Sequence, residues 1–373
     1  TIFAEMSARA LATGAVNLGQ GFPDVDGPRE IAQRAADAIM KGEGNQYPPG
    51  PGIPELRLAI AEHQQRFYGL GYDPASEVFV TAGATEAVAA ALLALVGPGD
   101  EVIAFEPYYD SYAANIAMAG ATRVPVTLAA PDFRPDLAEL ERKITSRTRL
   151  LLINTPHNPT GAVLTGDELR EIAGIAIRHD LVVVTDEVYE HLSFDRPHIP
   201  LATFPGMRER TVSISSAGKT FSFTGWKVGW ATGSPELIEA VKTTKQFMTF
   251  VASGPFQYAI AEALSLPGGY YDNLRADLRA KRDMLAAGLR DIGFGVYKPE
   301  GTYFITTDIA PLGEKDGVEF CLGLPERAGV VAIPTVLFYD NKEAGRTMVR
   351  FAFCKRPEIL EEALKRLAVL KPA

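Results

Sequence analysis

Short runs of β-branched and apolar residues alternate with helix-like stretches between Val78 and about Gly233, and this alternation constrains the fold more than any other feature of the sequence. The runs begin near Val78, Glu101, Leu150 and Leu181, and each of the first three is followed by a stretch with helical character. Strands separated by helices form a largely parallel sheet with helices on both faces. Ligands bind at the carboxyl ends of such strands, so we expect the functional residues there.

The remainder of the chain indicates a second, smaller domain. A turn-rich connector over 45–52 marks one expected boundary, and an amphipathic stretch over 276–289 has the character of a helix that links two domains. Strand-like runs and a final helix-like stretch beyond it indicate a smaller α+β unit. We therefore expect a large domain over 45–277 and a small domain assembled from 1–44 and 278–373.

The composition argues against two classes of partner. Of the 373 residues, 47% are hydrophobic and 22% are charged, which is typical of a soluble globular protein. The net charge is −9 and the isoelectric point is near 5.3, and no run of basic residues is present. Nucleic acids and anionic membranes are therefore not expected as partners.

Cysteine and histidine usage predicts neither a disulfide framework nor a metal site. The two cysteines are too few for a framework, which fits a reducing cytoplasm, and the five histidines form no metal-binding motif. The longest apolar stretch, from Ala87 to Val96, is too short to cross a bilayer. We expect a cytoplasmic protein. Because the sequence opens at Thr1 rather than Met, we also expect a short preceding segment.

A polar stretch around Lys219 lies between two strand-like runs, and three interpretations compete for this lysine. It can be an ordinary surface residue. It can end a phosphate-binding P-loop, but that motif requires glycine five positions before Gly218, where Ser213 stands. Alternatively, a lysine buried in this turn has a lowered pKa and attacks carbonyl groups, as a Schiff-base lysine for pyridoxal phosphate does, with Ser216 and Lys227 holding the phosphate.

A carboxylate ends another buried run. Asp186 follows four apolar residues and a threonine, and burial of its charge is costly unless a cation meets it. A pyridinium nitrogen is such a cation, and this pairing makes the ring an electron sink. Tyr189 lies three positions on and can reach the phenolic oxygen of the same ring. A metal-binding or purely structural carboxylate is the alternative.

Two further strand ends carry candidate ligands of a flat, phosphorylated cofactor. Gly83, Ala84 and Thr85 lie between a strand and a helix, where backbone N–H groups favour a phosphate. Tyr108 and Tyr109 follow the next strand, where either ring can stack on a cofactor or simply pack in the core.

Polar residues near the third strand and near the end of the chain suit an anionic substrate. Asn158 can donate to a phenolate or carboxylate, and His157 beside it is interpreted as a supporting hydrogen-bonding residue. Arg350 lies between Val349 and Phe351 in an apolar run, so its guanidinium needs an anion. A substrate α-carboxylate or a structural salt bridge can supply it.

Taken together, the chain resembles the class I/II aminotransferases, the fold-type I pyridoxal phosphate enzymes, over essentially its whole length. The motifs that agree in order and spacing are Asn158-Pro159-Thr160-Gly161, Asp186 with Tyr189, and Ser216-x-x-Lys219 with Lys227. The resemblance implies an α/β fold of type I, with a mainly parallel seven-stranded sheet sandwiched by helices in the large, cofactor-binding domain and a smaller α+β domain.

Within that family the pattern is most similar to the kynurenine, glutamine-phenylpyruvate and N-succinyldiaminopimelate aminotransferases. Four segments carry this closer similarity: 17–23, 45–47, 156–161 and 216–221. The resemblance implies a homodimer with shared active sites. It also implies that Lys219 forms the internal aldimine and later moves the proton between the substrate Cα and the cofactor.

The other roles are carried over from the family in the same way. Asp186 would hold the pyridine nitrogen, Tyr189 and Asn158 the phenolic oxygen, and Tyr109 would stack on the ring. Arg350 and Asn158 would bind the substrate carboxylate, with the backbone at Gly21 closing over it. The phosphate would be bound by Gly83, Ala84, Thr85, Ser216 and Lys227, and by Tyr47 of the partner subunit.

The implied reaction is a two-stage exchange of an amino group between an L-amino acid and a 2-oxo acid. An aromatic or apolar amino acid suits Phe22, Tyr108 and Phe338, and glutamate or glutamine is the other donor class considered. Two features depart from the family: Lys227 stands where many relatives have arginine, and 247–253 lacks an obvious polar specificity residue.

Three other functions are consistent with parts of the pattern. The first is an N-succinyldiaminopimelate aminotransferase, which belongs to one of the similar enzyme groups. A carbon–sulfur β-lyase would use the same cofactor carbanion to expel a leaving group. A sensor domain of a transcription regulator has this fold, but it follows a DNA-binding segment, and no such segment or basic patch is visible in the sequence.

Overall fold

The computed structural model describes residues 2–372, and its main feature is a seven-stranded sheet in the order β2-β8-β7-β6-β5-β3-β4. Only β8 runs antiparallel to its neighbours, so the expected mainly parallel sheet is confirmed. In chain order the strands are β2 (Val78–Ala82), β3 (Glu101–Glu106), β4 (Thr122–Thr127), β5 (Thr148–Asn154), β6 (Val182–Asp186), β7 (Thr211–Ser216) and β8 (Val228–Thr232).

Both faces of this sheet are buried, as parallel strands require. Successive residues of each strand point to opposite faces, so Val102 packs on one side and Ile103 on the other. One face is covered by α4 (Gly83–Leu95), α5 (Asp110–Met118) and α9 (Pro235–Lys245). The other face is covered by α3 (Pro54–Tyr68), α6 (Leu137–Lys143), α7 (Gly166–Arg178) and α10 (Gly254–Leu264), with α2 (Arg29–Lys41) against α10.

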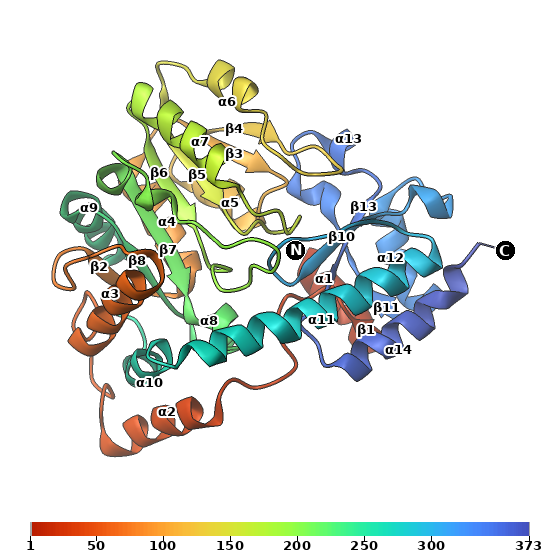
Figure 1. Cartoon of the computed structure of the whole chain (residues 1–373), viewed down its shortest axis with the longest axis horizontal. Helices are drawn as coiled ribbons and strands as arrows, with labels where there is room; N and C mark the ends of the chain where they lie inside the picture. Colours follow the sequence, from red (N-terminus) through yellow and green to blue (C-terminus); the bar gives the residue numbers. More distant parts are fainter. Residues whose placement is uncertain (1, 373) are drawn as a thin grey trace.

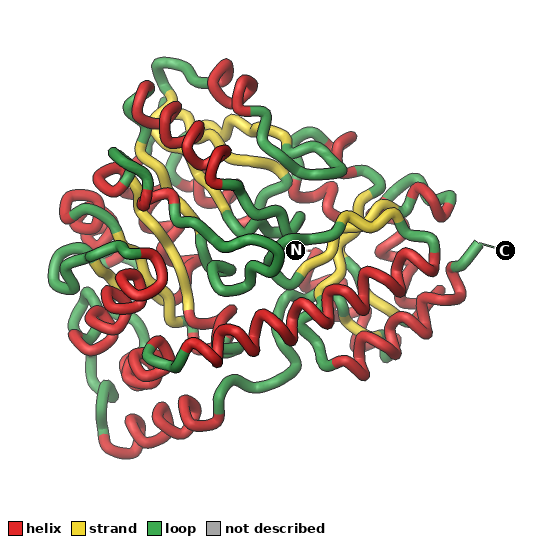
Figure 2. The backbone as a smooth tube through the Cα atoms, viewed as in Figure 1, coloured by secondary structure: helices red, strands yellow, loops and turns green. Residues whose placement is uncertain are grey.

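A second group of strands forms the smaller unit (Figures 1 and 2). Its antiparallel sheet has the order β12-β13-β10-β9, and β1 pairs in parallel with β11. These strands are β1 (Val16–Asn17), β9 (Gly295–Tyr297), β10 (Phe304–Asp308), β11 (Val330–Val331), β12 (Ile333–Pro334) and β13 (Met348–Ala352). The accompanying helices are α1 (Ile2–Thr13), α12 (Gly317–Ala328), α13 (Lys342–Gly345) and α14 (Pro357–Leu367).

The two ends of the chain share one hydrophobic core in this smaller unit. Met6 and Leu18 from the N-terminal segment are buried with Leu285, Phe320 and Leu360 from the C-terminal part. The long helix α11 (Gly268–Ile292) runs from one group of strands to the other (Figure 1). Its first turns contribute Tyr271 to the core beneath α3 and α10, and its later turns contribute Leu285 to the smaller core.

Two local features differ from the sequence-based expectations. Strand β4 was not expected because Pro125 interrupts its pattern; the strand lies at the edge of the sheet, where a proline costs no ladder hydrogen bond. Lys219 was expected in a turn but lies in a single helical turn, α8 (Ala217–Thr220), directly after β7.

The topology brings separate segments to one edge of the large sheet. Asn154, Asp186 and Ser216 end the parallel strands β5, β6 and β7. Strand β2 ends at the same edge, and antiparallel β8 begins there directly after Lys227. The cavity described next lies at this edge.

Candidate active site

A cavity of about 340 Å³ at this edge brings together most of the predicted site residues. Segments from both strand groups enclose it, because Arg350 comes from β13 and Lys219 from α8. The predicted residues that line it are Gly21, Gly83, Ala84, Thr85, Tyr109, Asn158, Asp186, Tyr189, Ser216, Lys219, Lys227 and Arg350.

The amine of Lys219 lies inside this cavity beside two tyrosines. Its Nζ donates a hydrogen bond to the Tyr303 hydroxyl at 2.9 Å and lies 5.7 Å from the centre of the Tyr189 ring. Burial lowers the pKa of Lys219 to about 8. A sizeable fraction of the amine is therefore neutral near physiological pH, as a nucleophile toward carbonyl groups requires.

Asp186 is a buried carboxylate without a cation in direct contact among residues 2–372. The Tyr112 hydroxyl donates to its Oδ2 at 2.6 Å, and the backbone N–H of Val188 donates to Oδ1 at 3.3 Å. Burial nevertheless raises the pKa of Asp186. A carboxylate held in this way is suited to a cationic ring nitrogen, which would restore its ionised form.

Positive charge gathers at the turn between β2 and α4. Gly83 adopts a left-handed φ of 75°, and a Cβ placed there would lie 3.1 Å from the Lys227 Nζ. A Cβ on Gly229 would lie 2.5 Å from the Gly83 carbonyl carbon, so only glycine allows β8 to approach this turn. The N-terminus of α4 and the Lys227 ammonium thus form a cradle for a phosphate.

Arg350 is buried with no carboxylate beside it in the described part of the chain. Its Nη1 donates to Asn158 Oδ1 at 2.9 Å and its Nη2 to the Gly19 carbonyl at 3.1 Å, whereas Nε has no partner. The Phe304 ring centre lies 3.9 Å from the guanidinium carbon. Burial lowers the pKa of Arg350 to about 10, so the group stays charged and lacks an anion.

The sequence matches the family described as aminotransferase class I and II over residues 13–367. The chain belongs to the class I and II aminotransferases. Members of this family are pyridoxal phosphate enzymes, and the lysine, the buried carboxylate and the phosphate cradle fit that cofactor.

Individual relatives agree with this assignment. The chain is 55% identical to a probable N-succinyldiaminopimelate aminotransferase of Mycobacterium tuberculosis, covering 99% of this chain and 96% of the relative. It is 40% identical to the methionine aminotransferase of Escherichia coli, covering 99% and 96%. The solved structure of N-succinyldiaminopimelate aminotransferase from M. tuberculosis matches with a TM-score of 0.97 at 56% identity, over 99% of this chain and 97% of that one.

The structure of the aminotransferase separates two predicted aromatic residues. Tyr109 lines the cavity and meets Tyr112 edge-on at 5.7 Å between ring centroids. Tyr108 does not line the cavity, because its hydroxyl donates to Asp340 at 2.9 Å. Of the two, Tyr109 is therefore the one that faces the cavity.

The apolar substrate pocket suggested from the sequence has different members. Phe22 and Phe338 do not line the cavity: Phe22 is 47% exposed, and Phe338 stacks on Phe3. Phe3 and Phe304 line it instead. The sequence pattern did not reveal them because Phe3 lies on α1, far along the chain from the motifs, and is brought there by the packing of the two ends of the chain.

His157 is buried and supports the loop that carries Asn158. Its Nδ1 lies 2.7 Å from the Thr160 hydroxyl, and burial lowers its pKa to about 3. The ring is neutral at physiological pH and does not line the cavity. This placement agrees with the supporting role expected from the sequence.

Tyr47 lies outside the cavity of this aminotransferase and is 82% exposed. Its ring meets the Phe250 ring edge-on, with 5.5 Å between the ring centroids. Phe247, three positions before Phe250, is 83% exposed. Thr249 in the same loop donates to Glu86 of α4. Large aromatic side chains thus gather at the surface beside the phosphate cradle.

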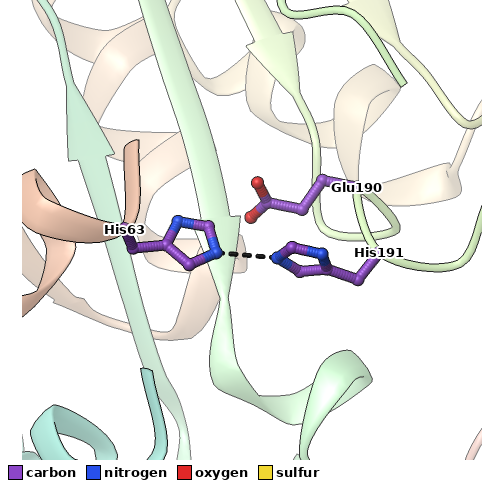
Figure 3. Close-up of side chains that lie close together, drawn as sticks. All are labelled: His63, Glu190 and His191. Atoms are coloured by element: carbon purple, nitrogen blue, oxygen red, sulfur yellow. Dashed lines mark hydrogen bonds between the residues drawn. The ribbon is translucent and has the colours of Figure 1, made fainter. Parts of the chain in front are cut away.

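Behind the cavity, His63, Glu190 and His191 form a buried cluster whose ligand-type atoms lie within 4.8 Å of one another (Figure 3). Spacing in the sequence does not reveal it, because 128 residues separate the two histidines. Each side chain already has a partner. The two Nε2 atoms lie 2.7 Å apart, and Glu190 accepts hydrogen bonds from the Tyr68 and Ser215 hydroxyls.

None of the helices described between residues 2 and 372 combines the length and apolar character needed to cross a membrane.

Proposed function

We propose that Lys219 is the cofactor-binding and proton-transferring residue of this aminotransferase and that Arg350 binds the α-carboxylate of an L-amino acid. The observation that carries the proposal is that two buried basic groups line one cavity and that one of them lacks an anion. Lys219 has a lowered pKa of about 8, and Arg350 is buried with a guanidinium that lacks an anion. An amino acid and its 2-oxo acid each present the carboxylate that Arg350 needs.

The residues around Lys219 would hold pyridoxal phosphate as the family does. Asp186 would receive the ring nitrogen, Tyr189 and Asn158 the phenolic oxygen, and Tyr109 would cover the ring face. The remaining ligands are those of the phosphate: Gly83, Ala84, Thr85, Ser216 and Lys227. When bound, this cofactor acts as an electron sink that stabilises negative charge at the substrate Cα.

The protein supplies position and proton transfer. Arg350 and Asn158 orient the α-carboxylate so that the Cα–H bond faces the Lys219 amine, whose pKa of about 8 suits a base that works near neutral pH. Phe3 and Phe304 line the cavity and keep water away from the reacting carbon. The backbone at Gly21 covers the substrate from the side of the N-terminal segment.

N-succinyldiaminopimelate is the substrate that we propose first. The relative of that name from M. tuberculosis is 55% identical over almost the whole chain. The aromatic lining from Phe3, Phe304 and Tyr109 favours a second candidate donor class, methionine or an aromatic amino acid, and the methionine aminotransferase of E. coli is 40% identical.

A donor panel separates these substrates. N-succinyldiaminopimelate, methionine, kynurenine, phenylalanine, glutamate and glutamine are each supplied with a 2-oxo acid, and kcat/KM is measured for every donor. We expect the highest value with N-succinyldiaminopimelate. A higher value with methionine or phenylalanine would move the assignment to the second class. Release of pyruvate and ammonia from a cysteine conjugate without a 2-oxo acid would identify a β-lyase.

We also propose a cytoplasmic homodimer in which Tyr47 of the partner subunit completes the phosphate site, with a large domain over 45–277 and a small domain from 1–44 and 278–373. The exposed rings of Tyr47, Phe247 and Phe250 support this arrangement. Mixing inactive Lys219→Ala and Tyr47→Ala chains tests it, because a mixed dimer would contain one site with both native residues. Activity that rises on mixing is the expected result; an unchanged sum contradicts shared sites.

A further inference from the structure

We propose that Tyr303 is a positioning residue that holds the free amine of Lys219 and links it to the N-terminal loop over 19–21. This inference rests on the proposed role of Lys219. Tyr303 belongs to none of the motifs that identify the site, and its hydroxyl is the only hydrogen-bond partner of the Lys219 amine among the residues described.

The hydroxyl of Tyr303 has a fixed hydrogen-bonding direction. It lies 2.5 Å from the carbonyl oxygen of Gly21 and 2.9 Å from Lys219 Nζ. A carbonyl can only accept, so the single phenolic proton is donated to Gly21. Toward Lys219 the phenolic oxygen is therefore an acceptor. Burial holds the pKa of Tyr303 well above its ordinary value, so the phenol does not itself exchange protons with the substrate.

The backbone that presents Tyr303 is held from two sides. The N–H of Thr302 donates to Leu192 at 2.8 Å, and the N–H of Phe353 donates to the Tyr303 carbonyl at 2.8 Å. Thr302 adopts a left-handed φ of 65°, and its hydroxyl accepts from the Phe304 N–H at 3.1 Å. Tyr303 itself is 1% exposed. The hydroxyl is thus aimed at Lys219 by a rigid segment.

The loop over 19–21 contacts Arg350 directly and reaches Lys219 through Tyr303. The Gly19 carbonyl accepts from Arg350, and the Gly21 carbonyl accepts from Tyr303. The loop is also packed tightly, since a Cβ on Gly21 would lie 2.4 Å from the Phe304 ring. A loop that closes over a bound carboxylate therefore also fixes the group that orients the Lys219 amine. Substrate binding and lysine orientation are coupled through Tyr303.

The direction of the bond predicts what loss of the hydroxyl does to Lys219. An acceptor beside an amine stabilises the charged form, so Tyr303→Phe should lower the pKa of Lys219 below about 8. The other groups that act on this amine, Asp186, Lys227, Arg350 and Cys354, are unchanged in the variant. The phenyl ring retains its edge-on contact with Tyr189 at 5.4 Å.

The experiment compares wild type, Tyr303→Phe and the control Tyr339→Phe. Tyr339 is also buried, and its hydroxyl meets Met348 Sδ at 3.9 Å. In cofactor-free protein, the rate of modification of Lys219 by an amine reagent is measured against pH by peptide mapping. We expect the midpoint to shift to lower pH in Tyr303→Phe and the neutral fraction at pH 7 to rise about threefold. In loaded enzyme, the single-turnover rate with an amino acid should fall about tenfold, with a larger effect of deuterium at Cα.

Several results of this experiment would overturn the proposed role of Tyr303. A lower melting temperature with unchanged Lys219 midpoint and turnover would make Tyr303 merely structural and overturn the proposal, and an equal shift in Tyr339→Phe would do the same. If Tyr303→Phe does not fold, Gly21→Ala tests the contact between Tyr303 and the loop from the loop side. The pH midpoint of Lys219 modification should again fall. If wild type itself shows no lysine-bound cofactor in its absorbance spectrum, the proposed role of Lys219 fails separately.

Discussion

Neighbouring residues at the ends of β6 and β7 face two very different environments. Tyr189 and Ser216 line the cavity, whereas Glu190 and Ser215, the adjacent residues, point behind it and are joined by a hydrogen bond of 2.5 Å. In front, Arg350 is a cation without an anion in contact, and Lys219 has the neutral hydroxyl of Tyr303 as its hydrogen-bond partner. Behind, His63, Glu190 and His191 have partners from the chain itself.

The comparison shows how buried polar groups distinguish a ligand site from a structural network. Both regions are buried, and both contain charged or titratable side chains. Buried polar groups are normally satisfied, because an unsatisfied one costs about 1–3 kcal/mol. A buried guanidinium without an anion, as at Arg350, indicates where a ligand completes the structure. Substitutions in front should therefore affect catalysis, and substitutions behind should affect stability.

The largest effect is expected at Lys219. Lys219→Ala removes both the carbonyl nucleophile and the base, so single-turnover rates with an amino acid should fall at least about 10³-fold. The free energy of unfolding of the cofactor-free protein should not fall, because a buried amine is removed. Lys219→Arg is the control that keeps a cation. Turnover of Lys219→Ala at the wild-type rate would contradict the assigned mechanism.

Arg350→Met should give the next largest loss. Loss of a charged hydrogen-bond donor to a carboxylate costs about 2–5 kcal/mol, so kcat/KM for amino acids should fall about 100-fold or more. Stability of the cofactor-free protein should change by less than about 1 kcal/mol, because the guanidinium is buried without an anion. Steady-state kinetics and denaturant titration measure the two quantities. A large stability loss with normal kinetics would show that Arg350 has a structural role and does not bind the substrate.

Glu190→Ala tests the region behind the cavity. It leaves the Tyr68 and Ser215 hydroxyls without their acceptor, so the free energy of unfolding should fall by about 2–4 kcal/mol. kcat/KM should stay within about fivefold of wild type, since Glu190 does not line the cavity. Glu190→Gln retains an acceptor oxygen and should lose less stability. A catalytic loss as large as that of Arg350→Met would erase the contrast between the two regions.

The smallest effect is the pH dependence of stability between pH 7 and pH 5. Burial lowers the pKa of His63 to about 3, so this ring is neutral in the folded protein and charged below its ordinary pKa of 6.5 in the unfolded chain. The contribution of this neutral ring to the free energy of unfolding is fully present above pH 6.5. It is lost as the pH falls toward 3, by about 1.4 kcal/mol per pH unit.

Denaturant titrations between pH 7 and pH 5 measure that slope. His63→Gln should reduce it by one proton. Equal slopes in wild type and His63→Gln would show that His63 is not buried as a neutral ring.

The sequence predicted those parts of the molecule that depend on local pattern and strand order. Asp186 ends an apolar run and Gly83 follows one, and a parallel sheet necessarily brings such positions to one edge. The choice between Tyr108 and Tyr109 could not be made, because it depends on which way each ring turns after the strand. Strand β4 was missed because Pro125 disguises an edge strand.

The residues that could not be predicted are defined by tertiary contacts. Tyr112 reaches Asp186 from α5, and Tyr303 reaches Lys219 from the position just before β10, 84 residues away in the chain. His63 meets His191 because α3 packs against the segment that follows β6. Such contacts depend on how distant elements pack, and no spacing in the sequence encodes them.

The most direct test of the account is to locate the lysine that carries the cofactor. Purified protein is loaded with pyridoxal phosphate, reduced with borohydride, digested and mapped by mass spectrometry, and a second sample receives an L-amino acid before reduction. We predict a pyridoxyl group on Lys219 alone, and its disappearance from the sample given the amino acid. Labelling of Lys227 or Lys245 instead, or a label on Lys219 that persists with every donor, would contradict the account.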